Sequence, residues 1–496
     1  MSSKKYRPWD PDQVYLFPPA MQDWLEEDHL VYRLIDVVNV LDIRSVSHSI
    51  HAKDARGTRP YDPRMMLALL FYSYMNGIYS SRQIAAATHE RIDFRVLSGD
   101  QQPFHTVINE FRLRHLSALP ELFVQVLKLC DRAGLVRLEH VSLDGSKVNA
   151  NASKHKAMSH GRMESEVERL EGEIQALLRK AEAIDAEEDE RYGRGEQAHA
   201  ISEELKCREN RLEAIRKAKA ELEEEARKAK AEELRERAER QRRAAETEAD
   251  STERKRKLTR ASKWEGKADC LADDEDNDHE SGSPDEPDDD LPSHRVATRR
   301  DGSPAPKAQR NFTDPDSRIM KRNGAFLQGY NCQIVVDEGH QIIVADGVSN
   351  QAPDQEHLIP MLGRVEKNTG RLPGCLTADT GYMSEEGAAH CDEHRVDAYI
   401  APSKQRHGRR GGHAAPEHEN RAWADMRAKL ATEEGKRIYS RRKVIVEPVF
   451  GQIKQARGFR RFSLRGLGKV RGEWTLVSLC HNLLKLLTVH TAPAVG

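Results

Sequence analysis

The stretch HVSLDGS, residues 140–146, joins a short, partly β-branched run to an aspartate and a glycine. This pattern predicts a strand that ends at Asp144. A second stretch, GCLTADTGYMS at 374–384, has the same pattern of an apolar run, an aspartate and a small residue, and it predicts a strand that ends at Asp379. If the two strands are parallel neighbours, both carboxylates lie at one edge of a sheet, where open α/β sheets place their sites.

The elements around these two stretches predict an α/β core. Residues 326–350 read as two strands joined by a tight turn, 354–370 as a helix and 396–403 as another strand. A single helix is then expected over 441–458, and it carries Glu447. The core is expected to comprise 136–160, with the first strand, and 311–490.

Glu447 lies in the most basic part of the chain. From Lys436 to Arg471 there are twelve Lys or Arg residues, and Glu447 is the one carboxylate. Three carboxylates brought together by the fold would favour Mg²⁺ or Mn²⁺, because these ions prefer oxygen ligands. Two such ions could support phosphoryl transfer, with the basic residues holding a phosphodiester backbone.

Each acid also has a simpler interpretation. Asp144 and Asp379 could cap turns or helices, and Glu447 could form a surface salt bridge. Three further acids in or beside the predicted hairpin are expected to serve turns and caps: Asp337, Asp346 and Asp354.

Residues 1–135 are predicted to be all-helical. One helix has Asp62 as N-cap, Pro63 in its first turn and Asn76–Gly77 as its stop, and Ser80-x-x-Gln83 suggests a capping box for the next. Short helices carrying arginines are compatible with a helix-turn-helix reader of DNA, roughly over 60–117. A plain helical bundle with solvated arginines fits these residues equally well.

Residues 161–262 show apolar or alanine residues at heptad spacing, flanked by Glu, Lys and Arg. Gly193 and Gly195 interrupt the pattern, so an antiparallel coiled-coil hairpin inserted into the core is expected; a parallel dimeric coiled coil is the competitor. The acidic stretch that follows is rich in turn formers, and 263–310 is predicted to be a disordered linker.

Composition restricts the class of protein. The chain has 496 residues, enough for about three domains. Its longest apolar run, MMLALLFYSYM, is about half of the ~20 residues that a membrane span requires. The seven cysteines form no C-x-x-C pair. These features predict a soluble protein of the cytoplasm.

The acidic motifs resemble those of bacterial insertion-sequence DDE transposases, in the branch with a helical insertion after the first aspartate. Asp144 in VSLDGSKVNANAS matches the first motif, and Asp379 in ADTGY matches the second. The third motif reads Y-x-x-R-x-x-x-E-x-x-x-x-x-x-K, and Glu447 and Lys454 keep its final spacing. The resemblance covers about 1–160 and 311–490.

The third motif departs from the family pattern upstream of the glutamate. Lys443 stands where the family has arginine, and Tyr439 and Arg442 each lie one residue too far upstream. This departure leaves the match of Glu447 itself unchanged.

The resemblance implies an RNase H-like α/β core with a helical N-terminal domain. It also implies that Asp144, Asp379 and Glu447 bind two Mg²⁺ (or Mn²⁺) ions and catalyse DNA strand cleavage and strand transfer. Expected partners are the terminal inverted repeats of the element, target DNA and a second subunit in a homodimer, on the bacterial nucleoid. The basic residues expected to contact DNA are Arg112, Arg114, Arg442, Lys443, Lys454 and Arg457.

Two other functions are compatible with parts of the sequence. One is a transposase-derived, DNA-binding regulator that no longer cleaves, although three retained acids argue against it. The other is a coiled-coil scaffold, which only residues 161–262 support.

Overall fold

The computed structural model describes residues 20–51, 60–188, 196–272, 290–402 and 421–489, apart from Ala249 and Asn323. The chain forms two compact units. Unit 1 contains Met1–Val136, Gln455–Gly458 and Thr475–Gly496, and unit 2 contains Arg137–Lys454 and Phe459–Trp474. Among the described helices, none is both long and apolar enough to cross a membrane.

Unit 1 is helical, as the sequence predicted. Its helices are α1 (Leu30–Val40), α2 (Arg44–His51), α3 (Pro63–Met75), α4 (Ser81–Glu90), α5 (Ile92–Leu97), α6 (His105–Arg114), α7 (Leu119–Arg132) and, from Thr475, the second part of α16 (Leu467–Val489).

The central helix of unit 1 is α3, whose residues from Met66 to Met75 are all buried. A helix that is apolar on every side is a core helix, which explains the unbroken apolar run. The Asp62 side chain accepts a hydrogen bond from the Arg64 N–H, so the predicted N-cap is confirmed. The predicted capping box at Ser80 is wrong, because the Ser80 side chain makes no capping hydrogen bond to α4.

The C-terminal helix completes unit 1. The Arg33 side chain donates to the backbone carbonyl of Leu487. The Cys130 thiol lies 3.9 Å from the backbone carbonyl oxygen of Asn482. The helical domain predicted over 1–135 therefore omits part of its own core. The local pattern of 1–135 contains no sign that a helix more than 300 residues later belongs to it.

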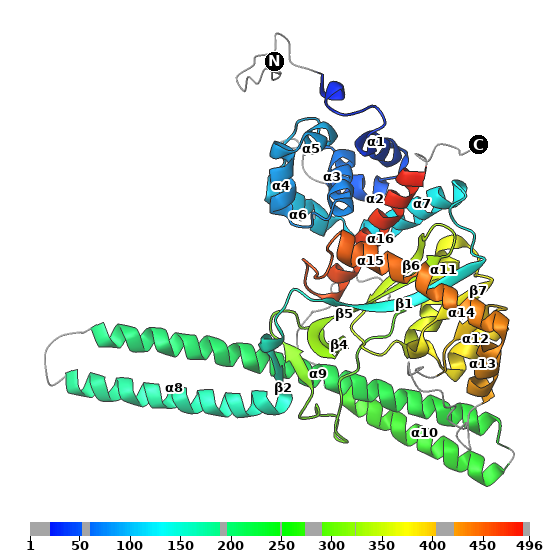
Figure 1. Ribbon diagram of the computed structural model, residues 1–496. Coiled ribbons are helices and arrows are strands. Elements are labelled where there is room, and N and C mark those ends of the chain that lie inside the picture. Colours follow the sequence, from blue (N-terminus) through cyan, green and yellow to red (C-terminus); the bar gives the residue numbers. More distant parts are fainter. Residues whose placement is uncertain are drawn as a thin grey trace, which may run out of the picture. The chain divides into compact units, whose positions relative to one another are not determined.

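Unit 2 is built on a six-stranded mixed sheet with the order β4-β5-β1-β7-β8, and β6 pairs with β5 as well (Figure 1). The strands are β1 (His140–Asn149), β4 (Arg318–Arg322), β5 (Ala325–Asp337), β6 (Ile343–Ser349), β7 (Cys375–Ala378) and β8 (Asp397–Ile400). Strand β1 is antiparallel to β5 and parallel to β7. This confirms a mixed α/β architecture.

Helices pack against the sheet or continue the chain at its edge. They are α11 (Leu358–Thr369), α12 (Glu385–Glu393), α13 (Arg421–Ala431), α14 (Glu433–Ile445) and α15 (Glu447–Gly451). A π-helix, Gln452–Ala456, follows α15 directly.

Three long helices lie between β1 and β4 in the chain, and we call them the helical insertion: α8 (His160–Glu188), α9 (Glu196–Glu246) and α10 (Ser251–Ala272). Helices α8 and α10 lie along different halves of α9 (Figure 1). Leu170 and Leu222 join α8 to the first half of α9, and Leu234 and Ala268 join its second half to α10.

The insertion therefore differs from the single hairpin predicted over 161–262, since a third helix returns along α9. The break predicted at Gly193 and Gly195 lies outside the described residues. The disordered linker predicted over 263–310 is wrong at both ends. Its beginning belongs to α10, and Leu291 and Val296 near its other end are 5% and 6% exposed because they are packed against neighbouring residues. Residues 273–289 are not among those described.

Candidate functional site

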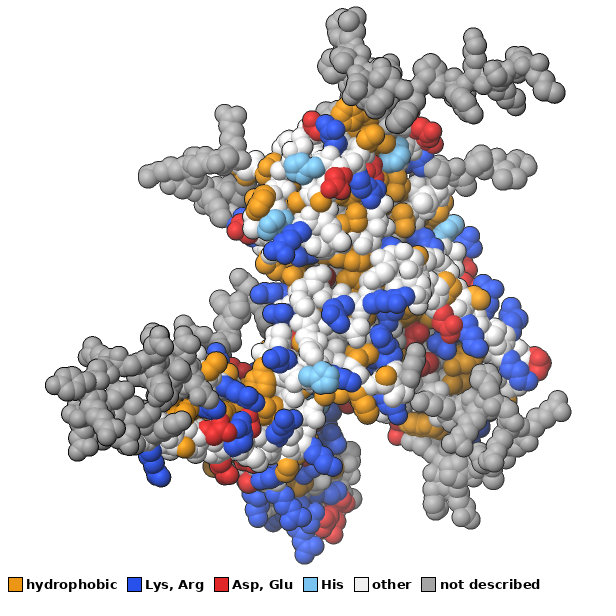
Figure 2. Space-filling view, turned by 60° about the vertical axis from the view of Figure 1, so that its left-hand side comes forward, with side chains coloured by type: hydrophobic (Ala, Val, Ile, Leu, Met, Phe, Trp, Pro, Cys, Tyr) orange, Lys and Arg blue, Asp and Glu red, His pale blue; other side chains and the backbone are white. Residues whose placement is uncertain are grey.

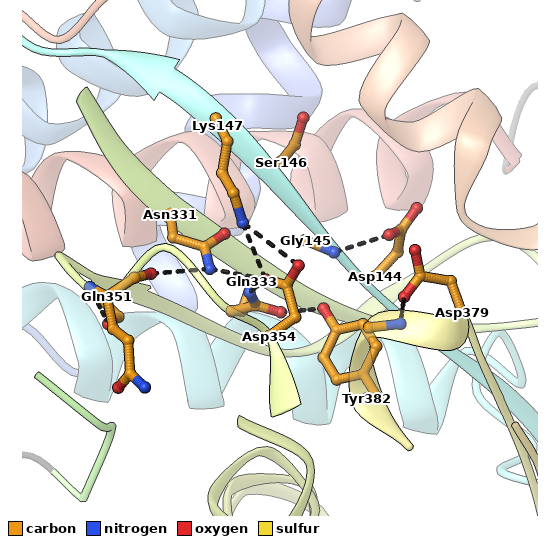
Figure 3. Close-up of polar contacts among 12 residues, drawn as sticks. Asp144, Gly145, Ser146, Lys147, Asn331, Gln333, Gln351, Asp354, Asp379 and Tyr382 are labelled. Carbon is orange, nitrogen blue, oxygen red and sulfur yellow. Dashed lines mark hydrogen bonds and ion pairs between the residues drawn. The ribbon is translucent and has the colours of Figure 1, made fainter. Parts of the chain in front are cut away.

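Strands β1 and β7 bring Asp144 and Asp379 together. The parallel pairing ends at Leu143 and Ala378, so Asp144 and Asp379 are the residues that directly follow the paired segment. Their side chains lie next to each other (Figure 3). We call this place the carboxylate edge.

Asp144 does not end its strand, contrary to the sequence prediction. Strand β1 continues to Asn149 because the long strand β5 still pairs with it, and only the pairing with β7 stops. Gly145 allows neighbouring side chains to approach the strand closely. A Cβ atom there would lie 2.5 Å from Gln333 Nε2, 2.9 Å from the Tyr382 hydroxyl and 3.0 Å from Asp354 Oδ1.

The carboxyl group of Asp144 is held in an unfavourable environment for a charge. Burial and then the nearby Asp379 carboxylate raise its pKa, Arg442 and the Gly145 N–H act in the opposite direction, and the net result is a pKa of about 7. The Gly145 N–H donates to Asp144 Oδ1 at 2.8 Å. An acid with a raised pKa next to a second acid is typical of a functional site.

Glu447 begins α15, after a break in the helix that the sequence predicted as continuous. Pro448 has no N–H to donate to the carbonyl of Val444, so the helix cannot continue regularly through it. The side-chain amide of Gln341 donates to that carbonyl instead, at 3.0 Å. Helix α14 therefore ends at Ile445, and Val446 forms a turn.

The break resolves the one-residue departure from the family motif. Arg442, not Lys443, faces the acids: its Nη1 lies 3.6 Å from Asp144 Oδ2 and its Nη2 lies 3.8 Å from Glu447 Oε1. The Tyr439 ring lies under the same guanidinium, 5.9 Å from its Cζ to the ring centroid. Lys443 is exposed. Spacing counted on an unbroken helix could not have found this arrangement.

Lys454 lies on the π-helix and reaches the backbone of β1. Its Nζ donates to the Ser146 hydroxyl and lies 3.4 Å from the carbonyl of Lys147. Burial lowers its pKa to about 8, so the side chain is still mostly charged at neutral pH. The π-turn itself is a feature found often at functional sites.

Asp354 anchors a polar network beside the carboxylate edge, and the sequence reading missed it. Its carboxylate accepts hydrogen bonds from Lys147 Nζ at 3.0 Å, Asn331 Nδ2 at 2.7 Å and Gln333 Nε2 at 2.9 Å (Figure 3). The Tyr382 hydroxyl donates to Gln333 Oε1, which connects the network to the turn after Asp379. Asp354 was expected to cap a helix, but its side chain makes no capping hydrogen bond. Asp337 does serve a turn, since it accepts from the Leu138 and Gly339 N–H groups.

Two of the predicted DNA contacts are built into unit 1. Arg112 is 6% exposed and donates to the Tyr74 hydroxyl and to the carbonyl of Tyr79. Arg457 lies 3.1 Å from His481 Nδ1, and burial lowers its pKa. These contacts give both arginines a structural role, and their assignment as DNA contacts stays a prediction. Arg114 is exposed, with Glu110 4.0 Å away.

The three acids do not yet form one metal centre. Within the part of the chain that the structure describes, no three His, Cys, Asp or Glu side chains are grouped closely enough to hold a metal ion. Asp144 and Asp379 are together, and Arg442 stands between Asp144 and Glu447. The donor chemistry nevertheless fits Mg²⁺ or Mn²⁺, because the acids supply only oxygen atoms and two of them repel each other.

Comparisons with known proteins match two parts of the chain to transposase families. Residues 19–114 match a family described as "Transposase domain (DUF772)", and 294–483 match the "Transposase DDE domain". These matches and the curated relative support membership of the bacterial insertion-sequence DDE transposases. Strand β1 and the helical insertion lie outside both matched ranges, so for Asp144 it is the pairing of β1 with β7 that links it to the DDE domain.

A relative of this chain is the curated "Transposase for insertion sequence element IS1106" of Neisseria meningitidis serogroup B. The two are 29% identical over 182 residues, which is 36% of this chain. The chain therefore spans about half the length of that relative, 55%. No solved structure matches the chain.

Proposed function

We propose that this protein binds the ends of an insertion sequence and catalyses Mg²⁺-dependent DNA strand cleavage and strand transfer. The observation that carries the proposal is the carboxylate edge, where parallel strands place Asp144 beside Asp379 and Arg442 connects Asp144 to Glu447. The family matches support the same reaction class.

The core that performs this chemistry is proposed to be RNase H-like. Three antiparallel strands, β6, β5 and β1, are followed across the sheet by the parallel strands β7 and β8. Along the chain, Asp144 lies on β1, Asp379 follows β7 and Glu447 begins α15, which is the order that the sequence predicted.

Asp144, Asp379 and Glu447 would hold two divalent ions. The chemistry that such ions supply is activation of an attacking water or 3′-hydroxyl and stabilisation of the leaving oxygen. The protein's own cations would bind the DNA backbone: Lys454 beside β1 and the exposed Lys443 close to Glu447. Unit 1, with Arg114 exposed, would recognise the element ends, and a homodimer would hold two ends together.

The competing function is a DNA-binding regulator without cleavage activity. The observation in its favour is the incomplete gathering of the three acids. One experiment separates the two: nicking of end-containing DNA by the full chain, with Mg²⁺ and with a chelator. Cleavage that requires Mg²⁺ supports the transposase, and its absence in the purified chain supports the regulator.

Glu447→Gln tests the assignment within that experiment. It removes a negative ligand without changing the shape of the side chain, so cleavage should fall by about 10³-fold or more while DNA binding stays equal or becomes slightly tighter. Glu434→Gln is the control, because Glu434 lies on the preceding helix and is 72% exposed. Cleavage at the wild-type rate by Glu447→Gln would return Glu447 to a surface salt bridge.

A further inference from the structure

Arg442 occupies an unusual position for a permanently charged group. Its side chain is only 15% exposed, yet it lies 3.6 Å from Asp144 and 3.8 Å from Glu447, beyond good hydrogen-bonding distance to either. Its Nε is buried and donates no hydrogen bond. A guanidinium frequently forms two parallel hydrogen bonds with one carboxylate, whereas Arg442 is shared between two carboxylates and also lies over the Tyr439 ring.

The same guanidinium lies between the third acid and Asp144. Asp144 and Asp379 already repel each other, and Arg442 is the positive charge beside them. Because arginine does not lose its proton in proteins, it cannot make room for a metal ion by becoming neutral. The side chain has to move if Asp144 and Glu447 are to share a divalent ion.

A DNA phosphate is the ligand most suited to draw Arg442 away. Two oxygen atoms of one phosphate can accept the two parallel hydrogen bonds of a guanidinium, and neither carboxylate accepts them here. Arg442 lies in the last turn of α14, four residues before the turn at Val446, so its position depends on a helix end.

We propose that Arg442 is a built-in counter-cation that occupies the metal site until a DNA phosphate removes it, so that divalent-ion binding is coupled to DNA binding. This inference rests on the proposed transposase function. It assigns Arg442 as a positioning residue, which acts on the site through Asp144 and Glu447. Its use would be to keep the free protein from loading metal before it holds DNA.

The coupling has to act in both directions. If DNA raises the affinity for the metal ion by some factor, the metal ion raises the affinity for DNA by the same factor. Removing the guanidinium should therefore strengthen metal binding in the free protein and weaken the dependence on DNA.

The test measures Mn²⁺ binding to the full chain by calorimetry, alone and with a short DNA duplex, after subtraction of Mn²⁺ binding to the duplex. We expect Arg442→Gln to bind Mn²⁺ about tenfold or more tightly than wild type without DNA, because a positive charge within 4 Å of two ligands is gone. DNA should increase Mn²⁺ affinity about tenfold in the wild type, within the usual range of coupling energies, and little in Arg442→Gln.

Two further variants make the result specific. Arg442→Lys keeps the charge and should stay close to wild type without DNA, which a loss of packing alone would not predict. Arg437→Gln removes a charge from the same helix, at a side chain that is 75% exposed, and should change neither affinity. Equal Mn²⁺ affinity of wild type and Arg442→Gln in the absence of DNA would overturn the inference.

The failure of this inference is distinguishable from that of the proposed function. If the wild type cleaves DNA with Mg²⁺ but Arg442→Gln shows unchanged metal affinity, only the counter-cation role is wrong. If the wild type neither binds Mn²⁺ with DNA present nor cleaves DNA, the transposase proposal and this inference are both overturned.

Discussion

The helical insertion and the carboxylate edge both contain many acidic side chains, but the two regions shift the pKa values of these acids in opposite directions. In the insertion, Glu166 accepts hydrogen bonds from Arg169 and Arg211, both at 2.7 Å, and the contact with Arg169 lowers its pKa. At the carboxylate edge, burial and the neighbouring Asp379 raise the pKa of Asp144 to about 7. The first arrangement favours ionised acids, and the second opposes them.

The difference shows what each region is organised to do. Basic and acidic side chains both occur in the lower part of the view in Figure 2, and ion pairs of the insertion, such as Arg216 with Glu171, join exposed side chains. Such pairs contribute little stability. The insertion must therefore be held together by the buried apolar residues between its helices, such as Leu170 and Leu222, which we call the apolar seam. Placing two carboxylates close together at the carboxylate edge lowers the folding stability, and natural proteins accept such a loss at functional sites.

The largest effect is expected from Leu222→Ala in the apolar seam of the insertion. Leu222 is 0% exposed, so the variant should lose about 2–5 kcal/mol through lost burial and a cavity. Hydrogen exchange of the α8 and α9 amides would measure the loss. Leu178→Ala, at a position on α8 that is 38% exposed, is the control and should have a much smaller effect. Equal protection in the two variants would mean that the seam does not hold the insertion.

The same substitution should have opposite signs in the two regions. Gly145→Ala forces a Cβ atom to within 2.5 Å of Gln333 Nε2 and should cost about 1–3 kcal/mol, with loss of cleavage. Gly172→Ala, in α8, meets no atom within 4 Å and should stabilise by about 0.5–1 kcal/mol. Chemical denaturation of both variants measures the pair. A stabilised Gly145→Ala protein would show that β1 is not crowded by the Asp354 network.

Asp144→Asn should stabilise the metal-free protein above neutral pH. The folded-state pKa of Asp144 is raised above its ordinary value of 3.8, so ionising it costs folding free energy once the pH rises through about 4 to 7. The variant avoids that cost and should gain about 1–2 kcal/mol at pH 8, with no gain below pH 4. Thermal unfolding across this pH range, with a chelator present, measures the difference. A gain that is independent of pH would contradict the electrostatic explanation.

The smallest effect is expected from Glu166→Gln. The variant breaks ion pairs with two arginines that are 47% and 57% exposed, and the loss should be below about 1 kcal/mol and smaller at high salt. Thermal unfolding at low and high salt is the measurement. A loss as large as that of Leu222→Ala would reverse the comparison, because the charges would then hold the insertion.

Local signals in the sequence predicted the elements well. Some elements depend only on residues that are neighbours in the chain, so the sequence alone is enough to predict them. They are the Asp62 cap and the apolar run of α3, the β5–β6 hairpin and the strand before Asp379. The similar patterns around Asp144 and Asp379 also predicted their meeting, and the parallel pairing of β1 with β7 does stop just before both residues.

The exceptions are residues whose partners are distant in the chain. Gly145 is needed because Gln333 and Tyr382 approach it, and Asp354 became a hydrogen-bond hub because Lys147 and Asn331 face it. No spacing rule contains these contacts.

The environment of the charged residues was the hardest property to predict from the sequence, since an arginine looks the same in sequence whether it faces water or a core. Arg112 and Arg457 were assigned to DNA, yet they bond within unit 1, where α16 completes the helical core. Arg442 was judged out of register, but Pro448 breaks the helix and places it between Asp144 and Glu447. Residue type and spacing identified the acids, while burial and the path of the backbone decided which cations stand beside them.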